Sequence, residues 1–173
     1  MSAIAIRPEQ PGDRTAIHSL LVVAFAGSNE ANLVDRLRAD GGLTASLVAT
    51  DGGRIVGQVA ASPIAIEGVP GRTAASLAPL AVLPERQRQG IGAALMNALP
   101  KRLAAAGTDL VFVLGDPAYY TRFGFHVDAA GEFWSPLAGP AFMVRELLPG
   151  ALDATRGSRL RYAPAFDPFL PPQ

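Results

Sequence analysis

Residues 80–93 read Leu80-Ala81-Val82-Leu83-Pro84-Glu85-Arg86-Gln87-Arg88-Gln89-Gly90-Ile91-Gly92-Ala93, and they pass from an apolar strand through a glycine-containing loop into a helix. The first turn of a helix has unpaired backbone N–H groups and the positive end of the helix dipole, so it can hold a pyrophosphate when no side chain blocks the approach. Gly90 and Gly92 provide that access. A glycine pair before a helix is equally typical of a plain strand-to-helix turn, so the segment alone leaves both interpretations open.

Two other phosphate-binding loops do not match this segment. A nucleoside-triphosphate loop needs Gly-Lys-Ser/Thr, which occurs nowhere in the chain. A dinucleotide fingerprint needs a third glycine where Leu95 stands, and it belongs after the first strand of a βαβ unit. Neither of these nucleotide-binding classes is favoured.

The chain before this segment predicts two helices among several strands. Apolar spacing from Ala16 to Phe25 predicts one helix with Asp13 as its cap, and a second helix is predicted from the cap Ser28 to the stop at Gly41-Gly42. The predicted strands are 3–7, 46–50, 55–66 and 73–82, with the hairpin turn at Asp51-Gly52-Gly53.

The chain after this segment predicts one long helix and more strands. Periodicity predicts a helix over 91–106, closed by Gly107, and a continuous apolar run predicts a buried strand over 110–114. The other predicted elements are a short helix over 118–123, a strand beginning at Phe125, a strand over 142–147 and an irregular tail after Pro164.

Three prolines fall inside predicted elements. Pro63 removes a ladder donor, which favours an edge, a bulge or an early end of its strand. Pro79 is expected to interrupt the strand over 73–82. Pro100 removes a helical hydrogen bond at a cost of about 3 kcal/mol, so we expect a kink or a late break in the long helix.

At this point the sequence resembles a known family. Leu80-Ala-Val-Leu-Pro followed by Gln87-x-x-Gly90-x-Gly92 is similar to the coenzyme A-binding signature of the GNAT superfamily of N-acetyltransferases, and Tyr120-Thr-Arg-Phe-Gly124-Phe125 resembles the element that closes the same fold. The resemblance covers roughly residues 3–127 and is close to a subgroup of predicted bacterial acetyltransferases. It implies an α/β acyl-coenzyme A N-acyltransferase fold, with a mixed central sheet and helices on both faces.

The resemblance also implies the residues that bind acetyl-coenzyme A. The backbone of Leu80, Ala81 and Val82 is expected to pair with the pantetheine arm. The amides of the loop and first helical turn are expected to hold the pyrophosphate: Gln87, Arg88, Gln89, Gly90, Ile91, Gly92 and Ala93. Tyr120 and Phe123 complete the cofactor-binding set. The side chains of Arg86 and Arg88 either add charge at the phosphates or, as we favour, face solvent.

The mechanism that the resemblance implies is direct attack of an amine on the thioester in a ternary complex. Tyr120 matches the family's general acid, whereas a core tyrosine is the alternative; Tyr119 is expected to serve packing. A backbone amide near Leu80 can donate to the oxyanion. The strand over 73–80 has no carboxylate to act as base, so Glu30 is the substitute and His126 a further candidate. A helix-dipole role is the plainer interpretation of Glu30. The alternative function is a non-catalytic acyl-coenzyme A sensor or interaction module.

Composition sets the remaining expectations. The chain has 173 residues, of which 49% are hydrophobic, so we predict a single domain over 1–173, with 131–173 as a C-terminal extension packed on it. Fifteen basic and 15 acidic residues cancel, which disfavours nucleic acid and anionic membranes as partners. With no cysteine and two distant histidines, no metal is expected.

The partner expected from the sequence is a small-molecule or peptide amine whose identity stays open. The aromatic loop over 131–140, with Phe133 and Trp134, is expected either to form a wall of the acceptor site or to pack in the core. A homodimer through the C-terminal segment is one expected assembly. No leader segment or run of roughly 18 apolar residues is seen, so the cytoplasm is the expected location.

Overall fold

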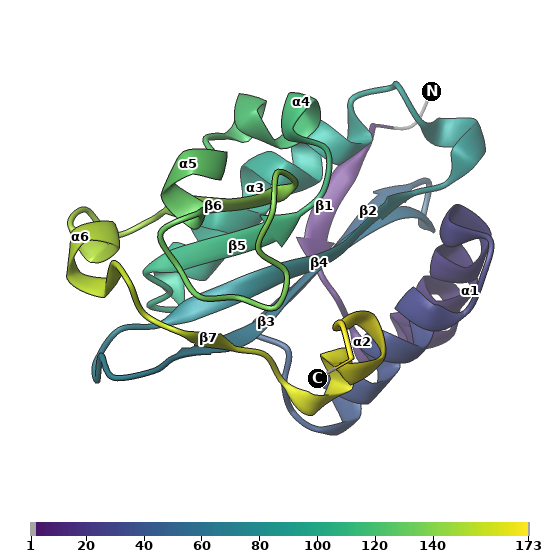
Figure 1. The fold of residues 1–173 in the computed structure, drawn as a ribbon. Helices are drawn as coiled ribbons and strands as arrows, with labels where there is room; N and C mark the ends of the chain where they lie inside the picture. The colour runs from purple at the N-terminus through teal and green to yellow at the C-terminus, as the bar shows by residue number, and fades with distance from the viewer. Residues whose placement is uncertain (1–2, 173) are drawn as a thin grey trace. The chain divides into compact units, whose positions relative to one another are not determined.

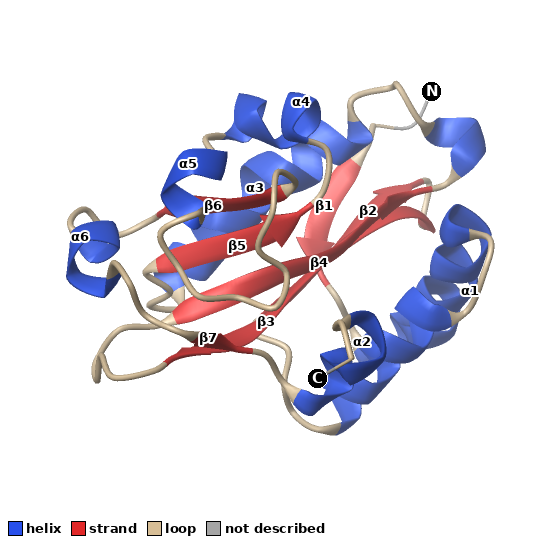
Figure 2. Ribbon diagram, in the orientation of Figure 1, coloured by secondary structure: helices blue, strands red, loops and turns tan. Residues whose placement is uncertain are grey.

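A computed structural model describes residues 3–172 (Figure 1). Seven strands form a mixed sheet, drawn in red in Figure 2, which confirms the predicted fold class. The chain falls into two compact units: one holds the residues up to Ala61 together with 78–102, and the other holds 62–77 together with the described residues from Leu103 onwards. Strands β3 (Arg54–Ile66) and β4 (Ala74–Val82) and helix α3 (Ile91–Ala105) each contribute residues to both units.

The first unit is built on an antiparallel meander. Strand β1 (Ala5–Pro8) pairs with β2 (Ala45–Asp51), and β2 pairs with β3 from Ala45↔Ala61 to Asp51↔Arg54. Helices α1 (Arg14–Phe25) and α2 (Asn29–Ala39) pack on each other. Their buried stripes recur at the spacing that the sequence shows: Ile17, Leu20 and Leu21 on α1, and Ala31, Leu33, Val34 and Leu37 on α2.

Helix α2 is anchored by a chain of polar side chains. The Arg38 guanidinium donates to Glu9 over 2.6 Å, the Ser46 hydroxyl donates to the same carboxylate over 2.5 Å, and the buried Gln58 amide donates to Ser46 over 3.1 Å. A buried charge is tolerated only when it is paired in this way. These side-chain hydrogen bonds therefore connect α2 to strands β2 and β3.

The second unit contains the parallel part of the sheet. The first residues of β4 pair in parallel with β5 (Leu110–Leu114), from Ala74↔Leu110 to Leu77↔Val113. Strand β6 (Phe142–Glu146) pairs with β5 in antiparallel fashion, and β7 (Leu160–Arg161) pairs with the end of β3. Strand β5 is buried from Leu110 to Val113, as its continuous apolar run predicts.

Two predictions for the C-terminal part are wrong. Phe125 does not begin a strand: its neighbour His126 makes one isolated bridge to Val144, and α5 (Val127–Ala130) follows at once. The tail after Pro164 is not irregular but forms the 3-10 helix η4 (Pro164–Phe169), because Ala165 and Phe166 find buried positions. Helix α6 (Ala151–Thr155) and strand β7 were not predicted at all.

The three prolines lie inside elements that continue past them. At Pro63 the predicted edge is confirmed on one side, because the pairing of β3 with β2 ends at Ala61 while the strand runs on to Ile66. Strand β4 is not interrupted at Pro79, and α3 runs through Pro100 to Ala105. Leu99 and Leu103, fully buried on either side of Pro100, supply packing that offsets the missing hydrogen bond.

Asp13 and Ser28 occupy the N-cap positions of α1 and α2, as predicted, but neither side chain makes a cap bond to its helix. Asp13 accepts two hydrogen bonds from the Arg7 guanidinium, at 2.6 and 3.0 Å, and one from the backbone of Gln10. These bonds, with Arg7 the larger cause, lower the pKa of Asp13 below its ordinary value. The Asp13 carboxylate is therefore bonded to the Arg7 guanidinium and not to the first turn of α1.

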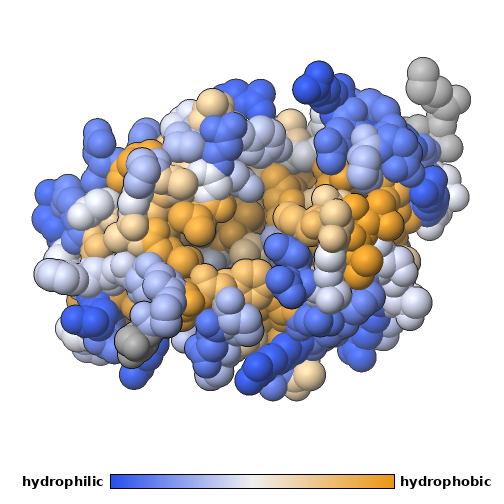
Figure 3. All heavy atoms as spheres, turned by 45° about the vertical axis from the view of Figure 1, so that its right-hand side comes forward, coloured by the Kyte–Doolittle hydropathy of each residue, from blue (hydrophilic) through white to orange (hydrophobic). Residues whose placement is uncertain are grey.

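On the face drawn in Figure 3, hydrophobic atoms reach the surface among hydrophilic ones. The large apolar side chains that are exposed include Val23, Phe25, Leu114, Leu148 and Trp134, of which Trp134 is the most exposed at 65%. Among residues 3–172, no helix has both the length and the apolar character that crossing a membrane requires.

Candidate active site

The loop between β4 and α3 lies in the first unit. After Val82 the chain makes the 3-10 turn η2 (Pro84–Arg86), and the backbone N–H of Leu83 donates to the Val56 carbonyl of β3 over 3.0 Å. The loop then runs exposed from Gln87 to Gly90 and enters α3 at Ile91, which is buried. The strand–loop–helix order predicted from the sequence is confirmed.

Side chains of the loop bond to the protein itself and hold the loop in place. The Arg86 guanidinium donates to Asp51 over 2.5 Å and to Gln89 over 3.1 Å, so Arg86 does not simply face solvent as we predicted. The Gln87 side chain donates to the Val82 carbonyl over 3.2 Å. Arg88 is exposed and has no side-chain partner in the described part of the chain. The loop backbone is therefore shaped by its own side chains.

The backbone at the start of α3 is arranged to receive an anion. Gly90 has a φ of +82°, which favours glycine, and a Cβ added there would meet no atom within 4 Å. The first bond of the helix runs from the Ala94 N–H to the Gly90 carbonyl over 3.0 Å. The amides of Ile91, Gly92 and Ala93 precede it, where a helix offers no carbonyl partner. Open approach and unpaired donors together fit a phosphate group.

Gly57 is a site-shaping residue that the sequence analysis missed. A Cβ at Gly57 in β3 would lie 3.0 Å from Ile91, 3.1 Å from Leu95 and 3.2 Å from the Ala81 carbonyl. The glycine therefore lets the first turn of α3 pack directly on the strand. A glycine inside a predicted strand is itself a sign of close approach by another element, and this sign was available in the sequence.

The Tyr120 element lies in the second unit. Helix α4 (Pro117–Tyr120) is capped by Asp116, whose carboxylate accepts from the Ala118 N–H over 2.9 Å. The 3-10 turn η3 (Thr121–Phe123) continues it and ends at Gly124, whose φ is +82°. Arg145 of β6 donates to the Phe123 carbonyl over 2.9 Å and so fixes the end of the element.

The ring of Tyr120 is enclosed by neighbours of the same unit. A Cβ at Gly115 would lie 2.5 Å from Tyr120 Cε2, and the rings of Tyr119 and Phe125 stand edge-on at 5.0 and 5.9 Å. Burial, with a smaller effect of Tyr119, raises the pKa of Tyr120 to about 12. The hydroxyl has no hydrogen-bond partner among residues 3–172. Tyr120 is thus a neutral donor with its proton unengaged.

Of the other predicted site residues, Phe123 has ring contacts, whereas the side chains of Glu30 and His126 have no partner in the described residues. Phe123 packs on Tyr119 at 5.3 Å with the Arg122 guanidinium 5.4 Å from its ring, and it is half-buried. Glu30 lies in the first turn of α2, half-buried, and its carboxylate has no partner in the described residues. The exposed His126 precedes α5 and likewise has no side-chain partner there.

The aromatic loop divides between core and surface. Phe133 is buried and stands edge-on to Phe112 at 5.0 Å, whereas Trp134 is exposed and lines a cavity. Core packing therefore applies to Phe133, whereas the adjacent Trp134 is free to form the wall of a site. Within residues 3–172, no group of three or more His, Cys, Asp or Glu side chains is placed to hold a metal ion.

Comparisons with known proteins agree with this geometry. The family model described as "Acetyltransferase (GNAT) domain" matches residues 43–127. A protein described as the uncharacterized N-acetyltransferase YhbS of Escherichia coli (strain K12) is 40% identical over 156 residues, which are 88% of this chain and 92% of YhbS. The uncharacterized N-acetyltransferase YjhQ of E. coli (strain K12) is 35% identical over 131 residues, 74% of this chain and 72% of YjhQ.

Two solved structures are similar over nearly the whole chain. The crystal structure of E. coli YhbS in complex with CoA has a TM-score of 0.86 at 36% identity and covers 96% of this chain and 93% of its own. A GNAT acetyltransferase from Brucella melitensis in complex with acetyl-CoA has a TM-score of 0.80 at 32% identity, covering 96% of this chain and 100% of its own. This chain belongs to the GNAT family of N-acetyltransferases, which confirms the predicted resemblance.

Proposed function

We propose that this chain transfers the acetyl group of acetyl-coenzyme A to an amine by direct attack in a ternary complex. The observation that carries the proposal is the open, glycine-containing loop before α3, whose unpaired amides suit a pyrophosphate. The CoA and acetyl-CoA complexes of the two similar structures support it. The match to YhbS over 88% of the chain supports one acetyltransferase domain over residues 1–173, extension 131–173 included.

The proposed cosubstrate contacts are mostly made by the backbone. Leu80, Ala81 and Val82 would pair with the pantetheine arm, and an amide near Leu80 would donate to the developing oxyanion. The amides from Gln87 to Ala93 would hold the diphosphate. Because the loop side chains of Arg86 and Gln87 already bond to the protein, they leave this role to the main chain.

Tyr120 is proposed as a hydrogen-bond donor to the leaving sulfur. A thiol of this kind has a reference pKa of about 8.5, well below the value of about 12 for Tyr120. Complete proton transfer from the phenol to the thiolate would therefore be uphill by about 3–4 pKa units, or ~5 kcal/mol. Donation of a hydrogen bond lowers the energy of the sulfur charge without that cost. Phe123 would flank this contact from the end of η3.

The attacking amine must lose a proton, since a lysine-like amine with a pKa near 10.4 is mostly charged at neutral pH. Glu30 is proposed as the base, with His126 as the alternative, because each has a side chain free of partners among the described residues. If Glu30 is the base, Glu30→Gln should lower kcat by about 100-fold or more and leave the Kd for acetyl-coenzyme A unchanged. An unchanged kcat would eliminate Glu30 and leave His126 to the same test.

The proposal is tested by calorimetry with acetyl-coenzyme A on matched glycine variants. Gly90→Ala should weaken binding by tenfold or more, about 1.4 kcal/mol, because a Cβ at this φ strains the loop and narrows the approach. Gly68→Ala is the control, since Gly68 has a similar φ of +79° and also has nothing near its Cβ. Equal effects of the two variants on affinity would contradict the assigned phosphate site.

Catalysis is tested by thiol release with a panel of amines. Release that depends on the amine supports acetyl transfer, and binding without release to any amine would favour the alternative, an acyl-coenzyme A sensor. A homodimer and a cytoplasmic location stay predictions from the sequence. Light scattering on the purified chain measures the first of these.

A further inference from the structure

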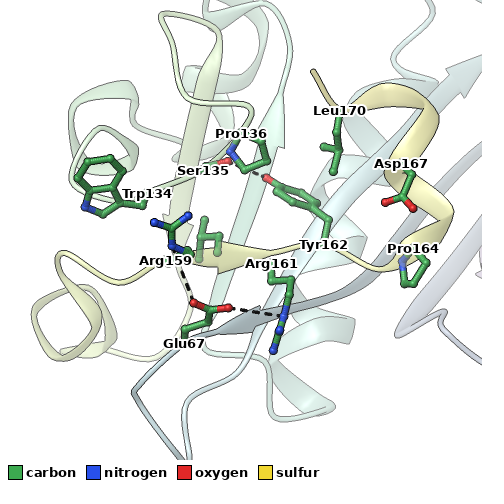
Figure 4. Close-up of a pocket in the computed structure, with 11 residues that line it drawn as sticks. Glu67, Trp134, Ser135, Pro136, Arg159, Arg161, Tyr162, Pro164, Asp167 and Leu170 are labelled. Atoms are coloured by element: carbon green, nitrogen blue, oxygen red, sulfur yellow. Dashed lines mark hydrogen bonds and ion pairs between the residues drawn. The ribbon is translucent and has the colours of Figure 1, made fainter. Parts of the chain in front are cut away.

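The second unit contains a cavity of about 470 Å³, and none of the proposed cosubstrate-binding residues lines it. Its walls come from the end of β3, the loop after Phe133, strand β7 and helix η4. In Figure 4, Glu67, Arg159 and Arg161 lie on one side of it and Asp167 on the other, with Tyr162 between them. Small-molecule sites commonly have volumes of about 300–1,000 Å³.

Two guanidinium groups on one wall share a single carboxylate. Glu67 lies 3.9 Å from Arg159 and 3.7 Å from Arg161, and it is the one acidic partner that either has among residues 3–172. These distances are too long for hydrogen bonds, so the N–H donors of both arginines stay available. The cluster carries one excess positive charge. A second carboxylate would supply both the missing charge and bidentate acceptors.

Trp134 gives the cavity an apolar rim. Its ring is 65% exposed, and the Arg159 guanidinium lies 5.9 Å from the ring centroid. Pro136 and Leu160 extend this apolar surface. An exposed indole beside a guanidinium can cover a flat or branched apolar group while leaving the charged donors free.

The opposite wall offers acceptors to an amino group. Asp167 is exposed and has no ion-pair partner in the described part of the chain. The Tyr162 hydroxyl is 3.4 Å from the Ser135 hydroxyl, at the long limit of a hydrogen bond. Cationic donors on one wall and acceptors on the other match a molecule that has a carboxylate at one end and an amine at the other.

We propose that this cavity binds the acceptor and selects amines that also carry a carboxylate, namely amino acids and their small derivatives. Arg159 and Arg161 bind the carboxylate after Glu67 is displaced, Trp134 covers the apolar body, and the amino group lies towards Asp167. The role of the ligand as acceptor rests on the proposed acetyl transfer. The ligand class rests on the cavity alone.

Binding is measured first, without acetyl-coenzyme A. Trp134 is the single tryptophan of the chain, so its fluorescence reports this cavity directly. Leucine should bind tenfold or more tighter than isoamylamine, which has the same body without the carboxylate. Arg159→Ala and Arg161→Ala should each remove that difference, and Arg36→Ala, an exposed arginine of α2, is the control.

Glu67→Gln separates ligand recognition from a structural role of the cluster. If the carboxylate of Glu67 competes with the ligand, Glu67→Gln raises the affinity for leucine and leaves that for isoamylamine unchanged. A purely structural ion-pair cluster would instead lose affinity for both compounds. Loss of affinity for both would therefore overturn the inference.

Transfer assays with the same pairs complete the test. Leucine should exceed isoamylamine in kcat/KM, and the preference should disappear in Arg159→Ala but not in the control Arg36→Ala. Transfer that shows no carboxylate preference, or a preference that both arginine variants keep, overturns the inference. Carboxylate-dependent binding with no transfer to any amine overturns the proposed function and leaves the ligand class of the cavity standing.

Discussion

At the scale of single residues, the Tyr120 hydroxyl has the features of a donor reserved for a ligand. Its ring is enclosed by Gly115, Tyr119 and Phe125, yet the hydroxyl has no protein partner among residues 3–172. Tyr120 is half-buried, and its hydroxyl is not among the buried polar atoms that lack a partner, so it reaches solvent. No described protein group therefore competes with a bound molecule for this donor.

Tyr120→Phe should lower kcat by about 100-fold and change the Kd for acetyl-coenzyme A little, because it removes one donor to the leaving sulfur. Tyr119→Phe is the matched control, since Tyr119 is adjacent and belongs to the same aromatic cluster. Steady-state kinetics and calorimetry measure the two quantities. Equal kinetics for Tyr120→Phe and the parent would assign Tyr120 to packing.

Gly115→Ala should reproduce much of the Tyr120→Phe defect without touching the hydroxyl. The new methyl group would lie 2.5 Å from Tyr120 Cε2, so the ring must move. Gly12→Ala, where a Cβ meets no atom within 4 Å, controls for the substitution itself. The double variant with Tyr120→Phe should be no slower than the slower single variant. Additive losses would show that Gly115 acts elsewhere.

At the scale of elements, the junction of β3 with α3 depends on one missing methyl group. Gly57→Ala should destabilise the protein by about 1–3 kcal/mol, since Ile91, Leu95 and the Ala81 carbonyl would crowd the Cβ. The same shift should weaken acetyl-coenzyme A binding through the displaced start of α3. Urea unfolding and calorimetry measure both effects, with Gly27→Ala, which meets only one atom at 4.0 Å, as control. Unchanged stability would mean that the junction can relax.

Elements with a strong local pattern were predictable from the sequence. The hairpin of β2 and β3, the buried run of β5 and the long helix α3 follow from apolar spacing and turn residues. Strand β7 was not predictable, because its two residues become a strand only through pairing with Ala65 and Ile66, far away in the chain. The strand predicted to begin at Phe125 is absent for a similar reason: Phe125 is buried by tertiary packing without joining a ladder.

The candidate site divides along the same line. The proposed phosphate loop is one contiguous segment, so the sequence alone is enough to predict Gly90 and its neighbours for that role. Contacts between distant segments were not predictable, which is why the roles of Gly115 and Arg145 and the sharing of Glu67 by two arginines appear only in the structure. At Gly57 the sequence could indicate a close approach but not that α3 makes it. Asp13 shows the converse case. Its local sequence predicts a cap bond to α1, but its carboxylate accepts from Arg7 instead.

At the scale of the whole molecule, alkaline pH should destabilise the protein through the half-buried Tyr120 and the buried Tyr162. Burial raises the pKa of Tyr120 and Tyr162 to about 12, against a reference near 10 in the unfolded chain. Between these values the folded state holds more protons than the unfolded state, so stability falls as pH rises through this window. The loss is at most about 2–3 kcal/mol for each group.

Urea unfolding from pH about 8 to 11.5 measures this loss. Below about pH 9 the tyrosines should cause no loss of unfolding free energy. Tyr162→Phe should flatten the decline by removing one of the two groups. Spectroscopic titration of the folded protein should show most tyrosinate forming only above about pH 11. Titration of all three tyrosines near pH 10 would show that their rings are solvated.

The clasp between Arg86 and Asp51 has a consequence for how this protein tolerates change. A diphosphate would be bound by main-chain N–H groups, which every residue but proline possesses, so a change of side chain at Ala93 leaves its donor in place. The side chains that matter here are those of Arg86 and Gln87, which hold the loop in shape beforehand. Apart from these, the buried Ile91 and Gly90 with its φ of +82°, the segment can exchange side chains and still present the same donors.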